Sequence, residues 1–204
     1  VENPNEFYLD LKEQKYKGLI NIYTSIIFNY KLKEIKICND AGRLTRPLLR
    51  VKNKNLLLTQ NILNKLTNDD CIWNDLLTNC YNNTSVIEYI DAEEQNTSSI
   101  ATTPRDIVNV NLQQLYNKYT HCEIHPSTIF GILASCIPFS EHNQSPRNTY
   151  QCAQTKQSIG VYVTNYNNRM DKTAYVLNTP QRPLVDTRTT NIVKLHKIPS
   201  GTNV

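Results

Sequence analysis

The side chains best suited to bind phosphate lie in a helix predicted over residues 145–157. Ser145 can cap the helix, and Pro146 can occupy its first position, where a missing N–H costs nothing. Arg147 follows in the first turn, beside the positive end of the helix dipole, and the predicted helix contains no acidic residue. Unsatisfied backbone N–H groups and this dipole favour an anion. The start of the helix is therefore a candidate phosphate site.

The rest of this helix is polar in a way that suits nucleic acid. Arg147, Gln151 and Gln154 share one helical face, and Tyr150, Gln154 and Gln157 share the adjoining face. Arginine for phosphate, amides for base edges or sugar hydroxyls, and tyrosine for stacking form a set that binds nucleic acid or nucleotides. The alternative is a solvent-exposed helix whose polar residues have no partner, which is the usual outcome for such patterns.

A second candidate site is the run His121, Glu123 and His125. On a strand these three side chains point the same way and could hold a metal ion. His-x-Glu also opens the zinc deaminase signature, but the later P-C-x-x-C of that signature is missing from the chain. The competing interpretation is that the trio hydrogen-bonds neighbouring backbone and positions the next helix.

Other catalytic patterns are weak. The acidic run at residues 91–94 could bind metal or do acid–base work, but it has no His or Cys at ligand spacing, so a solvated acidic turn is favoured. Five glycines are too few and too badly spaced for a phosphate-binding loop. No spacing indicates a Ser–His–Asp or Cys–His centre, and no aspartate cluster suits two Mg²⁺ ions.

Composition allows one large or two small domains in 204 residues. The net charge of +4 lies in residues 119–204, which hold 8 Lys and Arg against 4 Asp and Glu, while residues 1–118 hold 14 against 14. This imbalance suits a surface that touches a polyanion. There is no apolar run long enough for a membrane span and no signal-peptide start. Six cysteines without a C-x-x-C pair favour a reducing compartment.

The elements that must position these residues are of mixed type. The chain starts with valine instead of methionine and ends without a clear stop, so we expect a piece of something longer. Trp73 is expected in the core or at a domain contact. Periodicity and turn residues predict the following elements: a helix in 1–19, a hairpin in 19–51 with its turn at 39–42, two short helices in 54–80, a strand at 86–90, a linker in 95–118 with a domain boundary near Lys118, a buried helix at 127–136, a strand at 160–163, and an extended basic loop after Arg169.

Several short sequence motifs occur in an order that is known from one protein family. They are D-A-G-R (40–43), R-P-L (46–48), E-Y-I-D-A-E-E (88–94), T-H-C-E-I-H-P-S (120–127), I-P-F (137–139), H-N-Q-S-P-R-N-T-Y-Q (142–151), K-Q (156–157), G-V (160–161) and R-M-D (169–171). From about Lys15 to the last residue the chain closely resembles the second-largest subunit of multisubunit DNA-directed RNA polymerase, in its eukaryotic RNA polymerase II form. Its many asparagines, together with Cys152 and Gln154-Thr155, resemble a giant DNA virus version.

The resemblance implies an α+β, multi-domain architecture. Residues 1–52 match the first external domain of the family and residues 53–117 the second. Residues 118–204 match the N-terminal part of the hybrid-binding domain, which lines the cleft where template DNA pairs with nascent RNA. The implied partners are the largest and other polymerase subunits, template DNA, nascent RNA and NTPs, with no membrane. The implied location is the nucleus for a cellular protein, or the host cytoplasm, viral factory or virion for a viral one.

The implied activity is template-directed nucleotidyl transfer within the complex, with this segment inactive alone. Arg147 matches the family arginine that approaches the triphosphate of the incoming nucleotide, where it would neutralise developing charge. Tyr150 matches a tyrosine near the RNA 3′ end, and Gln144 and Gln157 match residues near the RNA or hybrid backbone. The resemblance places the catalytic Mg²⁺ mainly on the largest subunit and the Zn²⁺ site of the full-length subunit outside this segment.

Two other functions stay open at this point. The chain could be a non-catalytic nucleic-acid-binding module, which would bind an RNA–DNA hybrid with steep salt dependence. It could also be a metal-dependent hydrolase or deaminase built on His121, Glu123 and His125.

Overall fold

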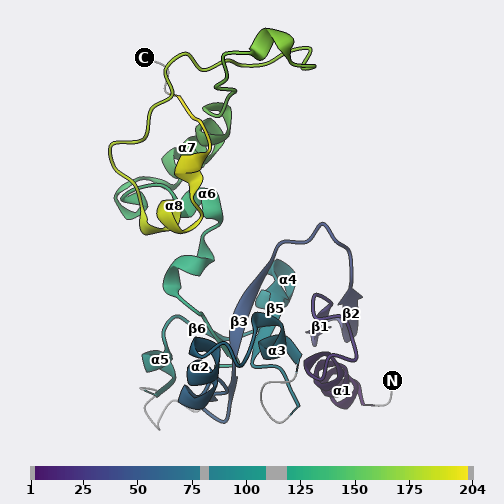
Figure 1. Cartoon of the computed structure of the whole chain (residues 1–204). Helices are drawn as coiled ribbons and strands as arrows, with labels where there is room; N and C mark the ends of the chain where they lie inside the picture. The colour runs from purple at the N-terminus through teal and green to yellow at the C-terminus, as the bar shows by residue number, and fades with distance from the viewer. Residues whose placement is uncertain (1–2, 79–82, 109–118, 202–204) are drawn as a thin grey trace. The chain divides into compact units, whose positions relative to one another are not determined.

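The computed structural model describes residues 3–78, 83–108 and 119–201 (Figure 1). The chain forms two compact units, Val1–Thr128 and Ile129–Val204. The predicted boundary near Lys118 falls on a residue outside the described part. Within the described ranges, no helix is both long enough and apolar enough to cross a membrane.

The first unit is built around two β-sheets. Its described strands are β1 (Ser25–Asn29), β2 (Glu34–Cys38), β3 (Thr45–Lys52), β4 (Asn55–Leu56), β5 (Ile87–Asp91), β6 (Ile100–Ala101) and β7 (His121–Cys122). β1 and β2 form an antiparallel hairpin. The larger sheet has the order β4-β3-β7-β6, and β5 also pairs antiparallel with β3, with Leu48 opposite Glu88. β3 is therefore the strand on which the unit is assembled, and Figure 1 shows it running through the centre of this unit.

The hairpin was predicted in the right region but with the wrong turn. The chain reverses at residues 30–33, where the side-chain oxygen of Asn29 accepts hydrogen bonds from the backbone N–H groups of Lys31 (3.1 Å) and Leu32 (3.2 Å). Lys33 takes the left-handed conformation that closes the turn, at φ 56°. Residues 39–42 instead connect β2 to β3, which belongs to the other sheet.

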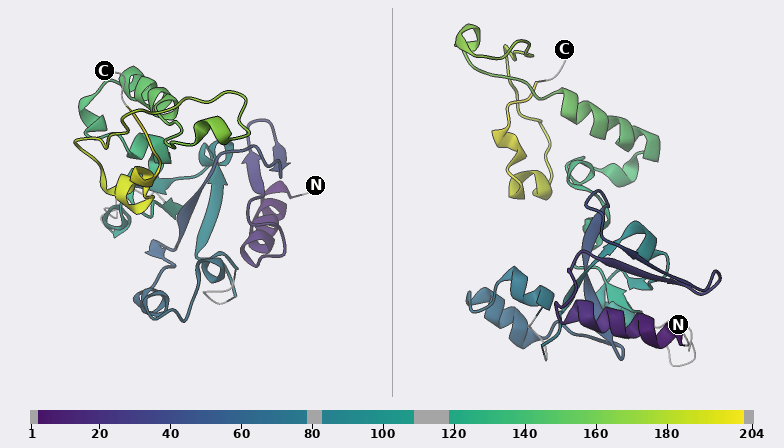
Figure 2. Two further views of the ribbon diagram at one scale, coloured as in Figure 1. Left: turned by 45° about the horizontal axis from the view of Figure 1, so that its top comes forward. Right: turned by 90° about the vertical axis from the view of Figure 1, so that its right-hand side faces the viewer.

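Five described helices surround these sheets, and they confirm the predictions for residues 1–19 and 54–80. They are α1 (Pro4–Tyr16), α2 (Gln60–Thr67), α3 (Trp73–Thr78), α4 (Ala92–Gln95) and α5 (Pro104–Val108). Figure 2 shows α1, in purple, lying beside the β1–β2 hairpin. Trp73 does not lie in the core: its side chain is 43% exposed, and its indole N–H donates to the hydroxyl of Tyr89 over 3.4 Å.

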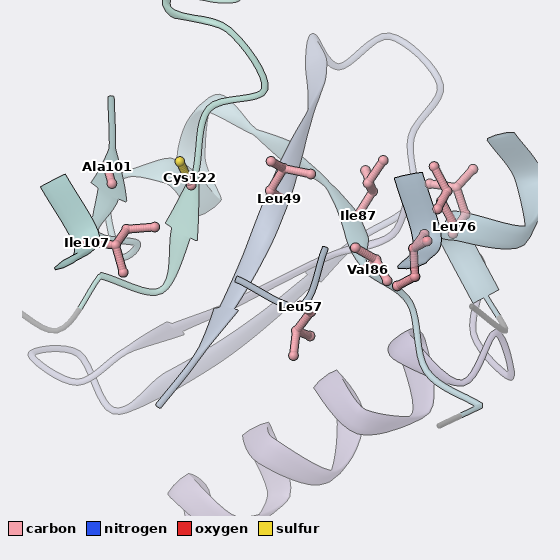
Figure 3. Close-up of a cluster of buried hydrophobic side chains, with 10 residues drawn as sticks. Leu49, Leu57, Leu76, Val86, Ile87, Ala101, Ile107 and Cys122 are labelled. Atoms are coloured by element: carbon pink, nitrogen blue, oxygen red, sulfur yellow. The ribbon is translucent and has the colours of Figure 1, made fainter. Parts of the chain in front are cut away.

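The apolar core of this unit joins side chains from distant parts of the sequence (Figure 3). Leu49 from β3, Leu76 from α3 and Ile87 from β5 pack together. The strand predicted at 86–90 is confirmed by β5, which runs from Ile87 to Asp91. Ile107 from α5 belongs to the same cluster. The interpretation of residues 95–118 as a linker is thus wrong for its first part, because β6 and α5 lie there and contribute buried residues.

The second unit is mostly short helices and irregular chain. Its described helical elements are α6 (Ile132–Ser135), α7 (Ser145–Gln157), α8 (Arg188–Ile192) and the 3-10 turns η2 (Ser140–His142), η3 (Tyr166–Asn168) and η4 (Leu195–Lys197). The 3-10 turn η1 (Pro126–Ile129) ends at the first residue of this unit. The predicted strand at 160–163 is reduced to isolated bridges, in which Ile159 pairs with Ser200 and Val161 with Val176. α6 packs against α7 and α8.

The predicted buried helix at 127–136 is wrong. Gly131 adopts an extended conformation, with φ −68° and ψ 174°, and separates η1 from α6. Phe130 and Ile132 are exposed by 52% and 64%. Among the described residues of this unit only Ile137 and Thr190 are buried, so the unit has little core of its own to cover these side chains.

Candidate nucleic-acid and nucleotide interface

The helix that carries the candidate phosphate site forms as predicted. α7 runs for 13 residues and Pro146 lies in its first turn. Figure 2 shows it as one straight helix. The capping residue differs from the prediction: Gln144 is the N-cap, and its side chain makes no capping hydrogen bond. Ser145 is already helical because the carbonyl oxygen of Gln144 accepts the first helical hydrogen bonds, from the N–H groups of Arg147 (3.0 Å) and Asn148 (3.3 Å).

The observed N-terminus of α7 leaves fewer free backbone N–H groups to bind an anion than the sequence predicts. Pro146 has no N–H, and the N–H of Arg147 is already bonded, so the first turn does not present a row of free amides. The guanidinium of Arg147 is exposed and has no ion-pair or hydrogen-bond partner in the described part of the chain. The first turn also has no acidic residue. Arg147 and the helix dipole therefore provide the positive potential together.

The predicted binding residues lie on one exposed side of α7. At about 100° per residue, Arg147, Tyr150 and Gln157 fall within an arc of about 80°. All three are exposed, and the ring of Tyr150 is 59% exposed. Gln157 lies about 15 Å from Arg147 along the helix axis, at 1.5 Å per residue. Gln144 is exposed just before the helix. The structure thus brings three of the four residues to one side of α7 and places the fourth, Gln144, at its N-cap.

A neighbouring part of the α7 surface is half-buried. Asn148, Cys152 and Thr155 are half-buried and lie about 80° to 140° around the helix from Arg147. Thr155 donates its hydroxyl to the carbonyl oxygen of Gln151 at 2.9 Å. Packing on this side fixes which side chains of the helix remain free.

The second candidate site does not assemble. His121 and Glu123 are buried and His125 is exposed. His121 Nε2 lies 2.9 Å from Glu88 Oε2, whereas Glu123 pairs with Arg46 and accepts a hydrogen bond from Thr128. The strand β7 ends at Cys122, so the alternation that would align the trio stops before Glu123. No group of three His, Cys, Asp or Glu that could hold a metal ion lies within the described ranges.

A buried ion cluster around Glu88 was missed by the sequence patterns. Lys12 Nζ lies 2.6 Å from Glu88 Oε1, and Lys15 Nζ lies 3.0 Å from the same oxygen. Lys12 also pairs with Glu94, which is 0% exposed. The cluster joins α1 to β5, α4 and, through His121, β7. The interpretation of residues 91–94 as a solvated acidic turn is therefore wrong: Asp91 caps α4 by accepting from the N–H of Glu94 at 2.7 Å.

Burial and neighbouring charges act in opposite directions on this cluster. Burial alone would raise the pKa of Glu88, but Lys12, Lys15 and His121 outweigh it and hold the pKa well below its usual range. Burial raises the pKa of Glu94, and the two lysines only partly offset this effect. For Lys12, attraction to Glu88 and Glu94 overcomes burial and raises the pKa. Glu88 is thus the carboxylate that the cluster keeps charged.

Acid should weaken the first unit. A carboxylate whose pKa is depressed on folding stabilises the fold above its unfolded pKa of about 4.3, and this contribution is lost as pH falls through the lower, folded pKa. We expect the free energy of unfolding to fall by about 1.4 kcal/mol per pH unit for each proton taken up below about pH 4. The pKa of Glu94 is raised on folding, so its protonation in acid does not lower the free energy of unfolding. Urea unfolding followed by circular dichroism between pH 3 and 6 measures the slope, and an unchanged slope in Glu88→Gln would contradict the assignment.

Comparison with known proteins identifies the family to which this chain belongs. Three family descriptions match it in order: RNA polymerase Rpb2, domain 4, over residues 1–52; domain 5 over residues 73–126; and domain 6 over residues 133–204. All three describe one kind of protein, a subunit of RNA polymerase. The chain belongs to the Rpb2 family, the second-largest subunits of DNA-directed RNA polymerases, and is similar to its domains 4–6.

Individual relatives agree with this assignment. The chain is 41% identical over 208 residues to DNA-directed RNA polymerase II subunit 2 of Arabidopsis thaliana, a match that covers 98% of this chain and 17% of the relative. It is 43% identical over 181 residues to subunit RPB2 of RNA polymerase II of Encephalitozoon cuniculi, covering 88% of this chain and 15% of the relative. It is 39% identical over 204 residues to subunit Rpo2 of Sulfolobus acidocaldarius, covering 99% and 17%. The chain therefore spans about a sixth of these relatives.

Proposed function

We propose that this chain forms part of the active-centre wall of a DNA-directed RNA polymerase and that Arg147 binds the triphosphate of the incoming nucleotide. The observation that carries the proposal is an exposed guanidinium at the start of α7 that has no partner among the residues the structure describes, at the end of the helix where the dipole is also positive. A cation at this end of a helix costs stability, by about 0.3–1 kcal/mol. A bound phosphate would remove that cost and turn the two positive potentials into binding energy.

The remaining candidates extend the interface along the same helix. Tyr150 would stack on a base near the RNA 3′ end, because its exposed ring offers a flat apolar face. Gln144 and Gln157 would contact the RNA or hybrid backbone through their amides. Polymerisation itself would be carried out by the assembled complex, in which phosphate neutralisation is the contribution of Arg147 to phosphoryl transfer.

The proposed partners are the largest and other polymerase subunits, template DNA, nascent RNA and NTPs. Within this proposal the catalytic Mg²⁺ is held mainly by the largest subunit and the Zn²⁺ site by other parts of the full-length subunit. We also propose that residues 1–52 and 53–117 correspond to the two external domains and residues 118–204 to the start of the hybrid-binding domain.

The cellular setting is a further part of the proposal. Similarity to RNA polymerase II subunits supports a nuclear location for a cellular source. The abundance of asparagine supports the alternative of a giant DNA virus, with transcription in the host cytoplasm, in a viral factory or in the virion.

A direct test uses an NTP that carries a photoreactive group on its γ-phosphate. In the assembled polymerase stalled on a template, we expect cross-links in residues 144–150, because Arg147 would lie against the triphosphate. Mass spectrometry of the digested subunit locates the label, and excess unlabelled NTP should abolish it. Specific label elsewhere in the polymerase, with none in this stretch, would contradict the proposed role of Arg147.

A non-catalytic nucleic-acid-binding module remains the second candidate. It is favoured by the one-sided, exposed row of Tyr150, Gln154 and Gln157 and by the excess of positive charge after residue 118. This function needs no contact between Arg147 and a nucleotide triphosphate. The two candidates therefore differ in the effect of Arg147 on the rate of nucleotide addition.

A further inference from the structure

Asn148 ties the first turn of α7 to the chain that precedes it. Its Nδ2 donates to the backbone carbonyl oxygen of Ser140 over 2.9 Å, and its Oδ1 accepts from Nδ2 of Asn143 over 3.3 Å. Asn148 is half-buried, whereas its neighbours Arg147 and Thr149 are exposed. One amide therefore uses both of its ends to hold η2 and the loop after it against the start of the helix.

The segment held in this way does not adopt its conformation easily. Phe139, just before η2, has φ 51° and ψ 42°, in the left-handed region that bulky residues rarely enter. Phe139 is 66% exposed, and its ring forms a T-shaped contact with the ring of His142 at a centroid distance of 5.8 Å. Backbone hydrogen bonds close the turn, from the N–H of His142 to the carbonyl oxygen of Phe139 (3.0 Å) and from the N–H of Asn143 to that of Ser140 (3.2 Å). The amide of Asn148 adds the side-chain bonds that tie this turn to α7.

We infer that Asn148 is a positioning residue for Arg147. The inference rests on the proposed function of Arg147 and extends it to the group that fixes the geometry. Arg147 directly precedes Asn148, and its backbone N–H bonds to Gln144, in the loop that the amide of Asn148 fixes. If the loop relaxes, the first turn and its guanidinium move with it, and a displacement of about 1 Å can cost about 100-fold in rate.

The test compares single and double variants in the assembled polymerase. We expect Asn148→Ala to reduce kcat/KM for nucleotide addition about tenfold, a smaller loss than that from removing the guanidinium. In the Arg147→Ala background the same substitution should change kcat/KM by less than about twofold, because the group that Asn148 positions is already gone. Rapid-quench measurements of single additions over a range of NTP concentrations provide both values.

Controls separate positioning from general damage. Thr149→Ala removes a bond within the same helix, from the Thr149 hydroxyl to the Ser145 carbonyl oxygen at 3.1 Å, and should leave the rate within about twofold. Asn143→Ala removes only the second of the two amide contacts and should give a loss of about twofold to threefold that also disappears without Arg147. If polymerase with Asn148→Ala fails to assemble, the Asn143→Ala variant tests the inference in its place.

The outcomes distinguish the two proposals. If Arg147→Ala leaves nucleotide addition unchanged, the proposed function fails. If Arg147→Ala slows addition but Asn148→Ala and Asn143→Ala do not, the positioning inference fails alone. Equal losses from Asn148→Ala with and without Arg147 would also overturn it, because Asn148 would then act independently of the guanidinium.

Discussion

Replacing Arg147 by alanine is expected to slow nucleotide addition by the assembled polymerase about 100-fold, or by about 2.7 kcal/mol in transition-state free energy. The side chain is exposed at the start of α7 and has no partner in the described ranges, so its loss should not disturb folding. What is lost is a positive charge aimed at the phosphates while the bond forms. Arg147→Lys should recover only part of the rate, because an ammonium cannot make the same bidentate contact.

Lys156→Ala provides the matched control. Lys156 is an exposed cation on the same helix, about 180° around from Arg147. Its replacement removes the same charge but should change the rate by less than about twofold. If both variants keep the wild-type rate and Arg147→Ala only weakens retention of an RNA–DNA hybrid at raised salt, the non-catalytic module becomes the better explanation.

The second large effect concerns stability. Glu88→Ala should lower the free energy of unfolding of the first unit by about 3–5 kcal/mol, because it leaves buried lysines without their main partner. Glu88 Oε1 lies within 3.0 Å of both Lys12 and Lys15, and Oε2 contacts His121. Urea denaturation at neutral pH, followed by circular dichroism, measures the loss.

Glu93→Ala is the control for this experiment. Glu93 forms an ion pair with Lys36 at 2.7 Å, but both side chains are about half exposed. Exposed pairs of this kind contribute little to stability, because solvent screens the two charges, so Glu93→Ala should have a much smaller effect than Glu88→Ala. A similar loss from Glu93→Ala and Glu88→Ala would show that burial of the cluster does not determine its contribution.

Local patterns were sufficient for the helix of the candidate interface. Helix signals depend on neighbouring residues, so Pro146 and the polar sequence after it predicted α7 and the exposure of Arg147. The short motifs and their order in the sequence also indicated the polymerase subunit family, which the comparisons confirm. The roles of Gln144, Arg147, Tyr150 and Gln157 remain proposals.

Tertiary structure decided the features that join distant residues. Lys12 and Glu88 are 76 positions apart, and neither position has a local pattern that predicts burial of a charge. The same holds for His121, whose partner is on another strand and not two residues along its own. Phe130 shows the converse: its apolar neighbours predicted a buried helix, but the described residues of the second unit leave it 52% exposed.

The start of α7 combines both kinds of information. The sequence by itself determined that an arginine follows a proline at a helix start, because those preferences depend on backbone geometry within one turn. Only the folded chain showed that Gln144 is the N-cap and that Asn148 holds the preceding loop, because hydrogen bonds from side chains to a turn depend on where that turn lies in space.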